Sequence, residues 1–381
     1  MTDDTLFDDA SDDASNSEHR PQPGANIADG IYLSMSFADY LADRALSGSA
    51  FKTLLTDPAG LWWDSSDNPL YVEPSKAANR HRLRGSAAHC LILEGEEAYQ
   101  RAYQLPPPGC LTSFEDCKEW MRRARATFEA QLGKKLGREE AKPFLLGDDK
   151  DELCARILAL DPDAPIWTPA PGVEIMHESD DAFVRLAARF ITNDAEYVPY
   201  FENGFSEVSI FVTIDGVRRK CRPDRLNAKG IVDLKTYGKP PRLGLDLKRH
   251  CVREAGFNGY DLQAVNNLDV LAEASNRLRA GTLKVHGDPE RAKAYRAMVD
   301  AHEEEQDFGF RWLFTRMNGA LTSIMLPFRE GDQLDMARSD IEVATGIYQD
   351  MVAMCGDGIW SISAGVQEID EGDFVPRMSS Y

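Results

Sequence analysis

Hydrophobic residues recur along this chain with two periods, and the change from one period to the other separates helices from strands. Helical spacing predicts helices over residues 47–55, 84–93 and 181–201. Strict alternation over residues 207–214 predicts a strand that ends in an Asp215-Gly216 hairpin turn. We therefore expect an α/β fold, and the sequence contains no internal repeat.

A second predicted hairpin carries the residues with the clearest chemistry. Residues 227–230 form a predicted turn, so the segments on either side can pair and bring Asp224 near Asp233. Within the second segment, the period of two places Asp233 and Lys235 on one face while Leu234 points into the core. Two carboxylates and one ammonium could share a divalent metal and a phosphodiester, because magnesium accepts one or two carboxylates and completes its shell with water and phosphate.

An ordinary strand edge is the alternative for these three residues. Asp-x-Lys strings are common by chance, and Pro223-Asp224 is also a usual start of a turn. The buried pair Ile231-Val232 argues against this alternative, since a buried strand has little use for an acid and a base at its end.

Several motifs, in the same order along the chain, resemble a known nuclease family. Pro223-Asp224 followed by Asp233-x-Lys235 resembles the signature of the PD-(D/E)XK nuclease superfamily. Residues 205–211, 222–225 and 231–236 resemble the C-terminal nuclease domain of exodeoxyribonuclease VIII and its phage-borne relatives. Three flanking motifs are similar to those of the same family, namely its Gly-x-x-x-His helix at 83–94, its Tyr-x-x-Gln helix at 260–263 and its closing Gly-x-Trp at 358–360.

The resemblance implies a restriction-endonuclease-like core over residues 29–381, with a mixed central sheet flanked by helices. Within it, the charged and proline-containing residues 105–171 are expected to form a helical accessory insertion. The implied activity is magnesium-dependent hydrolysis of double-stranded DNA from its ends, 5′ to 3′, in phage-type recombination or DNA processing. A ring-shaped homo-oligomer and a single-strand annealing protein as partner are implied as well. The alternatives are a PD-(D/E)XK endonuclease of restriction or repair type and a non-catalytic DNA-end-binding protein.

The resemblance also assigns a metal site. His89, Asp224, Asp233 and the Leu234 carbonyl would hold Mg²⁺, with Mn²⁺ tolerated because histidine is a less natural ligand for magnesium. Lys235 would orient or deprotonate the attacking water, or stabilise charge on the phosphate. Without the resemblance, a lone helical histidine is more often a core or surface residue. Gly85 lies four residues before His89 on the same helix face and would let another segment approach closely.

Three further candidates lie on one face of the next helix. Tyr260, Gln263 and Asn267 are spaced by three and four residues, and by resemblance the first two position Lys235 or the DNA strand. In the alternative they cap the helix or pack it on the sheet. Related nucleases often carry tyrosine where this chain has Asn267, which puts an aromatic contact there in doubt. Glu207 is an additional candidate that could face the same cleft, or instead form a surface pair with Arg219.

The distribution of charge agrees with a polyanionic substrate better than its total does. The net charge of −20 argues against DNA binding, because lysine and arginine supply most non-specific affinity. Seven acids lie in residues 1–20, so residues 1–28 are expected to be a disordered acidic tail. Residues 216–255, by contrast, contain twelve basic residues and four acids. From this basic island we expect four arginines to contact DNA, with a merely solvated face as the alternative: Arg218, Arg219, Arg222 and Arg225.

Composition and cysteine placement exclude other classes. The chain lacks an apolar run of about eighteen residues and lacks the features of a signal peptide, so a soluble cytoplasmic protein without membrane contact is expected. Its seven cysteines are scattered without a C-x-x-C pair, as reduced thiols would be. Only Cys251 and Cys355 follow the predicted core, so we expect neither an iron–sulfur cluster nor a structural zinc.

Overall fold

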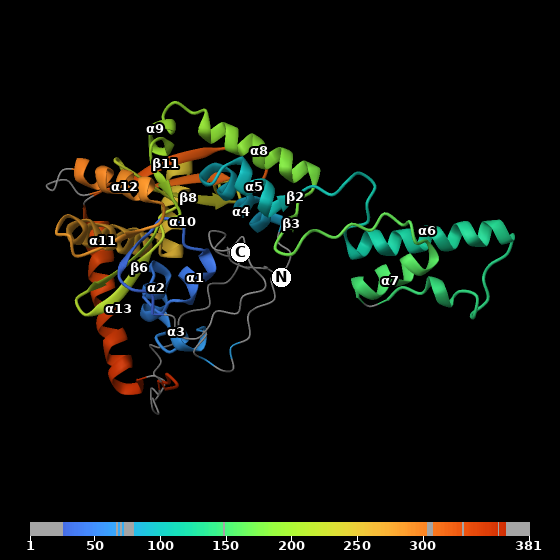
Figure 1. Cartoon of the computed structure of the whole chain (residues 1–381), viewed down its shortest axis with the longest axis horizontal. Coiled ribbons are helices and arrows are strands. Elements are labelled where there is room, and N and C mark those ends of the chain that lie inside the picture. Colours follow the sequence, from blue (N-terminus) through green and yellow to red (C-terminus); the bar gives the residue numbers. More distant parts are fainter. Residues whose placement is uncertain are drawn as a thin grey trace.

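The fold is mixed α/β, with sheets flanked by helices, as expected from the sequence (Figure 1). The computed structural model describes residues 26–65, 68, 71, 80–147, 149–302, 308–329, 331–356 and 358–362. The acidic tail expected over residues 1–28 lies outside the described residues except for its last three.

Two large sheets carry the strands of the predicted site. One has the strand order β11-β10-β8-β7-β4 and the other has the order β6-β5-β1-β9. Pairing within them is antiparallel except between β8 and β10 and between β1 and β9, so both sheets are mixed. Two short strands, β2 and β3, form a third sheet. The strands are β1 (Gly30–Tyr32), β2 (Tyr103–Gln104), β3 (Glu174–Ile175), β4 (Phe205–Ser206), β5 (Ser209–Ile214), β6 (Val217–Cys221), β7 (Arg225–Asn227), β8 (Gly230–Tyr237), β9 (Val285–His286), β10 (Phe310–Arg316) and β11 (Ser323–Phe328).

Helices pack on these sheets in groups that are distant in sequence. The helices α2, α11 and α13 share one buried apolar cluster, while α4 and α8 share another. The helices are α1 (Phe37–Ala42), α2 (Gly48–Thr56), α3 (Gly60–Trp63), α4 (Arg80–Leu93), α5 (Glu96–Ala102), α6 (Phe114–Leu132), α7 (Lys150–Leu160), α8 (Glu178–Thr192), α9 (Val198–Phe201), α10 (Leu247–Asn258), α11 (Tyr260–Arg279), α12 (Pro289–Ala301) and α13 (Asp332–Cys355), with a 3-10 turn at Lys142–Phe144.

The predicted helices and hairpins are found with shifted ends. The helix predicted at 47–55 is α2, and the one predicted at 84–93 is α4, which begins four residues earlier. The helix predicted at 181–201 is two helices, α8 and α9. The turn between β5 and β6 has positive φ at both Asp215 (50°) and Gly216 (77°), the geometry of a tight hairpin turn.

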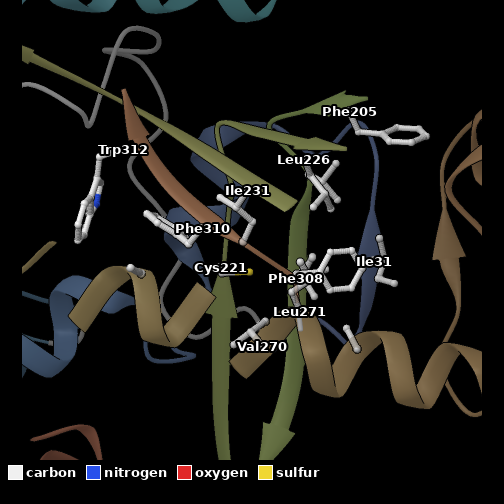
Figure 2. Close-up of a cluster of buried hydrophobic side chains, with 14 of the residues drawn as sticks. Ile31, Phe205, Cys221, Leu226, Ile231, Val270, Leu271, Phe308, Phe310 and Trp312 are labelled. Atoms are coloured by element: carbon white, nitrogen blue, oxygen red, sulfur yellow. The ribbon is translucent and has the colours of Figure 1, made fainter. Parts of the chain in front are cut away.

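The main core joins the two large sheets through α11. Its members come from β1, β4, β6, β7, β8 and β10 as well as from α11, and Figure 2 shows Val270 and Leu271 of α11 pointing toward the strands. Leu226 of β7 and Ile231 of β8 lie in this cluster and are fully buried. The hairpin that carries Asp224 and Asp233 is therefore fixed by the core of the protein.

The region between 105 and 171 forms a helical arm. Its helices α6 and α7 lie apart from the sheets in Figure 1 and pack on each other around a small buried cluster of their own. The thiols of Cys117 and Cys154 lie 3.7 Å apart within this cluster, and both are free. Neither helix lines the predicted site, so the arm does not contribute residues to it.

Candidate metal and acid–base site

The β7–β8 hairpin brings Asp224 next to Asp233, as its sequence predicts. Pairing between the two strands stops at Arg225 opposite Val232, and β8 continues to Tyr237 without β7 beside it. Asp224 occupies that edge, where its Oδ2 accepts a hydrogen bond of 2.6 Å from the Leu234 N–H. In a strand the N–H and C=O of one residue point to the same side, so the Leu234 carbonyl is also turned toward this edge.

Asp233 and Lys235 lie side by side on one face of β8. Both are almost fully buried, with 1% and 2% of their surfaces exposed. The Lys235 Nζ lies 3.2 Å from Asp233 Oδ2 and donates to Gln263 Oε1 at 2.9 Å. It also lies 4.2 Å from the centre of the Tyr260 ring, which is within range of a cation–π interaction. The first turns of α11 therefore hold the lysine in place.

The helix α4 contributes His89 to the same group of residues. Gly85 lets α4 lie close to the sheet, because a Cβ there would come within 2.8 Å of the Thr236 hydroxyl. This close approach agrees with the prediction made for Gly85. The His89 Nε2 lies 3.0 Å from Asp224 Oδ2, and its Nδ1 lies 3.6 Å from Glu207 Oε1.

Glu207 joins the cluster from an interruption between β4 and β5. Its φ of 57° breaks the strand, and its N–H donates to the Asp224 carbonyl at 3.3 Å. Arg222 Nε donates to Glu207 Oε2 at 2.7 Å and so orients the carboxylate. The guanidinium is fixed in turn by the Ser209 hydroxyl and the Met35 carbonyl. Glu207 is therefore paired with Arg222, and not with Arg219 as the surface alternative supposed.

These groups offer a ligand set for a metal. One ligand atom each from His89, Glu207 and Asp224 lies within 4.8 Å of the other two, in the part of the chain that the structure describes. The His89 Nε2 and the Asp233 Oδ2 are buried, and each faces a charged neighbour: the Asp224 carboxylate at 3.0 Å and the Lys235 ammonium at 3.2 Å. Two carboxylates and an imidazole fit a divalent cation, because carboxylate oxygens and imidazole nitrogens are common ligands of such ions. Glu207 thus belongs to the cluster more closely than Asp233, whose oxygens face Lys235 and Gln263.

Burial and neighbouring charges shift the pKa values of the cluster in different directions. Burial opposes charge on His89, but Asp224 and Glu207 outweigh it and raise the pKa of His89 to about 9. Burial is the main cause that raises the pKa of Asp233 to about 7, with Asp224 adding to the rise. Burial likewise raises the pKa of Glu207, whereas for Asp224 the charges of His89 and Lys235 outweigh burial and lower the pKa. The carboxylates are largely buried and close to one another, and a bound cation would stabilise their charged forms.

A cavity of about 430 Å³ opens over the cluster. His89, Glu207, Asp224 and Lys235 line it, together with the three α11 residues that were predicted to share a face, Tyr260, Gln263 and Asn267. Sequence reasoning missed other polar residues that line it: Ser47, Ser49, Lys52, Ser86, Glu94 and Lys220. Ser86 could have been found, because it precedes His89 by three residues and shares its helix face. The cavity gives a substrate access to both the carboxylates and the lysine.

The four arginines expected to contact DNA have internal partners instead. Arg219 is only 5% exposed and lies against Phe51 and Thr345, which corrects the expectation that it faces a polyanion. Arg218 pairs with Asp43, and Arg225 donates to the Phe201 carbonyl. Of the four, only Arg222 lines the cavity, where it holds Glu207. Arg219 is therefore too buried to contact a polyanion, whereas Arg218 stays partly exposed and Arg222 orients a carboxylate of the cluster.

The comparisons with known proteins add little to this geometry. No family model matches the chain, and no curated protein matches it. Among solved structures, the chain is similar to a crystal structure described as a "Putative exonuclease" from Eubacterium rectale, with 11% sequence identity and a TM-score of 0.40 over 83% of this chain and 87% of that chain. A likeness at this TM-score and identity gives no information on the function of this chain. None of the described helices is long and apolar enough to cross a membrane.

Proposed function

We propose that this protein is a metal-dependent nuclease of the PD-(D/E)XK type. The observation that carries the proposal is the meeting, in one cavity, of a His89–Glu207–Asp224 ligand cluster with the buried Asp233–Lys235 pair. A nuclease needs these two parts together: carboxylates that bind a hard cation, and a base or cation beside them for the water or the phosphate. A structural ion-pair network would not need the cavity or a histidine between two carboxylates.

Each residue then has a defined part in hydrolysis. Glu207, Asp224 and His89 would hold the metal, with the Leu234 carbonyl and Asp233 beside them. When bound, the metal would polarise a non-bridging phosphate oxygen and lower the pKa of its water. We expect Mg²⁺ in this role, with Mn²⁺ tolerated because of the histidine. Gln263 and Tyr260 hold the Lys235 ammonium, which orients the water or stabilises charge on the phosphate.

As substrate we propose double-stranded DNA ends, digested from 5′ to 3′ in phage-type recombination or DNA processing. The support is the sequence resemblance to exodeoxyribonuclease VIII and its phage-borne relatives, because the cluster itself would serve any phosphodiester. The same resemblance supports a ring-shaped homo-oligomer and a single-strand annealing partner. An endonuclease of the same superfamily and a non-catalytic end-binding protein remain the alternatives.

One experiment separates these three functions. The full-length protein is incubated with Mg²⁺, with Mn²⁺ or with EDTA, and with matched linear and supercoiled circular DNA. An exonuclease degrades only the linear DNA, an endonuclease nicks the circle, and an end-binding protein retards the linear DNA without shortening it. Asp233→Ala should abolish cleavage. Residual magnesium-dependent cleavage by this variant within about tenfold of the wild-type rate would contradict the assignment of Asp233.

Labelled strand ends decide the direction. Linear duplexes carrying a label at one 5′ end or one 3′ end should lose the 5′ label first. The opposite order would reject the proposed polarity while leaving the metal-dependent chemistry intact.

A further inference from the structure

The helix α10 presents an exposed face that combines positive charge with apolar side chains. Its buried side holds His250, Cys251 and Ala255. On its exposed side, Phe257 is 61% exposed and Val252 is 50% exposed. Lys248, Arg249 and Arg253 are also exposed. An exposed aromatic ring near basic side chains combines the two kinds of group that bind a nucleic-acid strand, one for bases and one for phosphates.

The charge of this segment is opposite to that of the chain as a whole. Residues 238–258 contain five basic residues and two acids, whereas the whole chain has a net charge of −20. One of the two acids, Asp246, caps the helix by accepting from the Arg249 N–H at 2.7 Å. Asp246 also pairs with Arg249 at 3.8 Å, and Glu254 is partly exposed, so three basic residues stand against two acids and the net charge of the helix surface stays positive, which suits a polyanion.

This face leads into the cavity of the candidate site. The helix ends at Asn258, and both Asn258 and Gly259 line the cavity, followed by Tyr260 and Gln263 at the start of α11. Phe257 immediately precedes these lining residues in the chain. A strand whose phosphate lies at the cluster would leave the cavity along α10.

We propose that the exposed face of α10 is the track for a single DNA strand that enters or leaves the active site, with Phe257 stacked on a base and the three basic side chains on phosphates. This inference rests on the proposed nuclease function. A single strand is the occupant that the face fits, because exposed bases stack on aromatic rings while basic groups follow the backbone, and neither feature reads sequence.

Stacking by Phe257 is tested with oligonucleotides that contain the fluorescent base 2-aminopurine. The full-length protein is titrated in EDTA, so that binding is measured without hydrolysis. Phe257→Ala should weaken single-strand affinity by roughly 5- to 100-fold and remove the quenching of one 2-aminopurine position. Phe257→Trp should retain both, whereas Phe257→Leu should lose the quenching. The control is Phe190→Ala on α8, which removes another exposed phenylalanine that does not line the cavity.

The electrostatic part is tested by charge reversal. Replacing Lys248, Arg249 and Arg253 by Glu should lower affinity at low salt and reduce the salt-dependence slope by about 2, since each phosphate contact on a single strand contributes about 0.7 to it. The matched control reverses three exposed basic residues of α12, which contributes nothing to the cavity: Arg291, Lys293 and Arg296. This control has the same change in net charge, so a purely global effect would appear in both variants.

The outcomes separate this inference from the function on which it rests. Wild-type protein that cleaves DNA while the α10 variants and the α12 control bind alike would overturn the track and leave the nuclease intact. A wild-type protein that neither binds nor cleaves DNA would overturn both. Absence of 2-aminopurine quenching in the wild-type protein would overturn the stacking role of Phe257.

Discussion

The close contact between α4 and β8 allows a sharp test of how His89 is positioned. Gly85→Ala adds a Cβ that would lie 2.8 Å from the Thr236 hydroxyl, whereas ordinary contact begins near 3.4 Å. The helix or the threonine must therefore move by roughly 0.6 Å. This contact lies about one helical turn before His89. Because a misplacement of about 1 Å can cost about 100-fold in rate, we expect cleavage to fall by roughly 10- to 100-fold.

Stability should change much less than activity in this variant. Overpacking costs about 1–3 kcal/mol, while replacing glycine by alanine inside a helix returns about 1 kcal/mol. Chemical denaturation should therefore show a loss of about 2 kcal/mol at most. Gly346→Ala in α13 is the matched control, because a Cβ there meets nothing within 4 Å. That control should keep full activity.

A second substitution decides whether the Thr236 hydroxyl is the cause. Thr236→Ala removes the clashing atom, so Gly85→Ala combined with Thr236→Ala should recover the cleavage rate of Thr236→Ala alone. Thr236→Val keeps a methyl group in that place, so the corresponding double variant should stay impaired. Single-turnover cleavage rates are measured for all five variants, the three single substitutions and the two double variants. Full activity in Gly85→Ala, or equal recovery by alanine and valine, would refute the idea that this contact positions His89.

Three further predictions concern the rest of the site and the N-terminus. Lys235→Ala should slow cleavage by roughly 100-fold or more while calorimetry shows metal affinity little changed; lost metal binding with a rate merely halved would reverse the roles given to the lysine and the carboxylates. Arg222→Met leaves the Glu207 carboxylate partly buried without its partner and should cost about 3 kcal/mol of unfolding free energy, whereas Arg222→Met with Glu207→Gln should recover part of that loss in the same denaturation assay. Deleting residues 1–25 should preserve thermal stability and raise DNA affinity at low salt, with the gain shrinking as salt increases; weaker binding by the truncated protein at low salt would contradict the repulsion by the acidic tail. The deletion stops at 25 because the Ile27 N–H donates to Asp43 at 2.7 Å.

The hairpin and its strand could be predicted because local rules determine them. The turn predicted at residues 227–230 fixes which residues of β7 and β8 face each other. The period of two then places Asp233 and Lys235 on the face opposite to Leu234. The shared face of Tyr260 and Gln263 follows in the same way from helical spacing. Each of these inferences needs only the residues of one or two adjoining elements.

The sequence makes Glu207 a candidate for the same cleft, but such rules do not predict the backbone turn that places it there. The alternation over 207–214 treats it as the first residue of a strand, but its positive φ breaks the strand between β4 and β5 and turns the side chain toward His89. A left-handed backbone at a glutamate is rare, so no sequence pattern would have predicted it. The structure keeps it because Arg222 and the Asp224 carbonyl hold the residue from two sides.

The basic island shows that a count of charged residues predicts the net charge of a segment but not which of its side chains are exposed. Basic residues of this one segment differ in exposure: Arg219 is buried against α2 and α13, while Arg249 and Arg253 are exposed on α10. Strand β6 is covered on both faces, so its basic side chains must find partners inside the protein, as Lys220 does with the carbonyls of Tyr40 and Asp43. A surface helix has one face exposed to solvent, where basic side chains need no partner inside the protein. Exposed positive charge within this segment therefore lies on α10, and under the proposed nuclease function this helix is where a chain with a net charge of −20 would attract a polyanion.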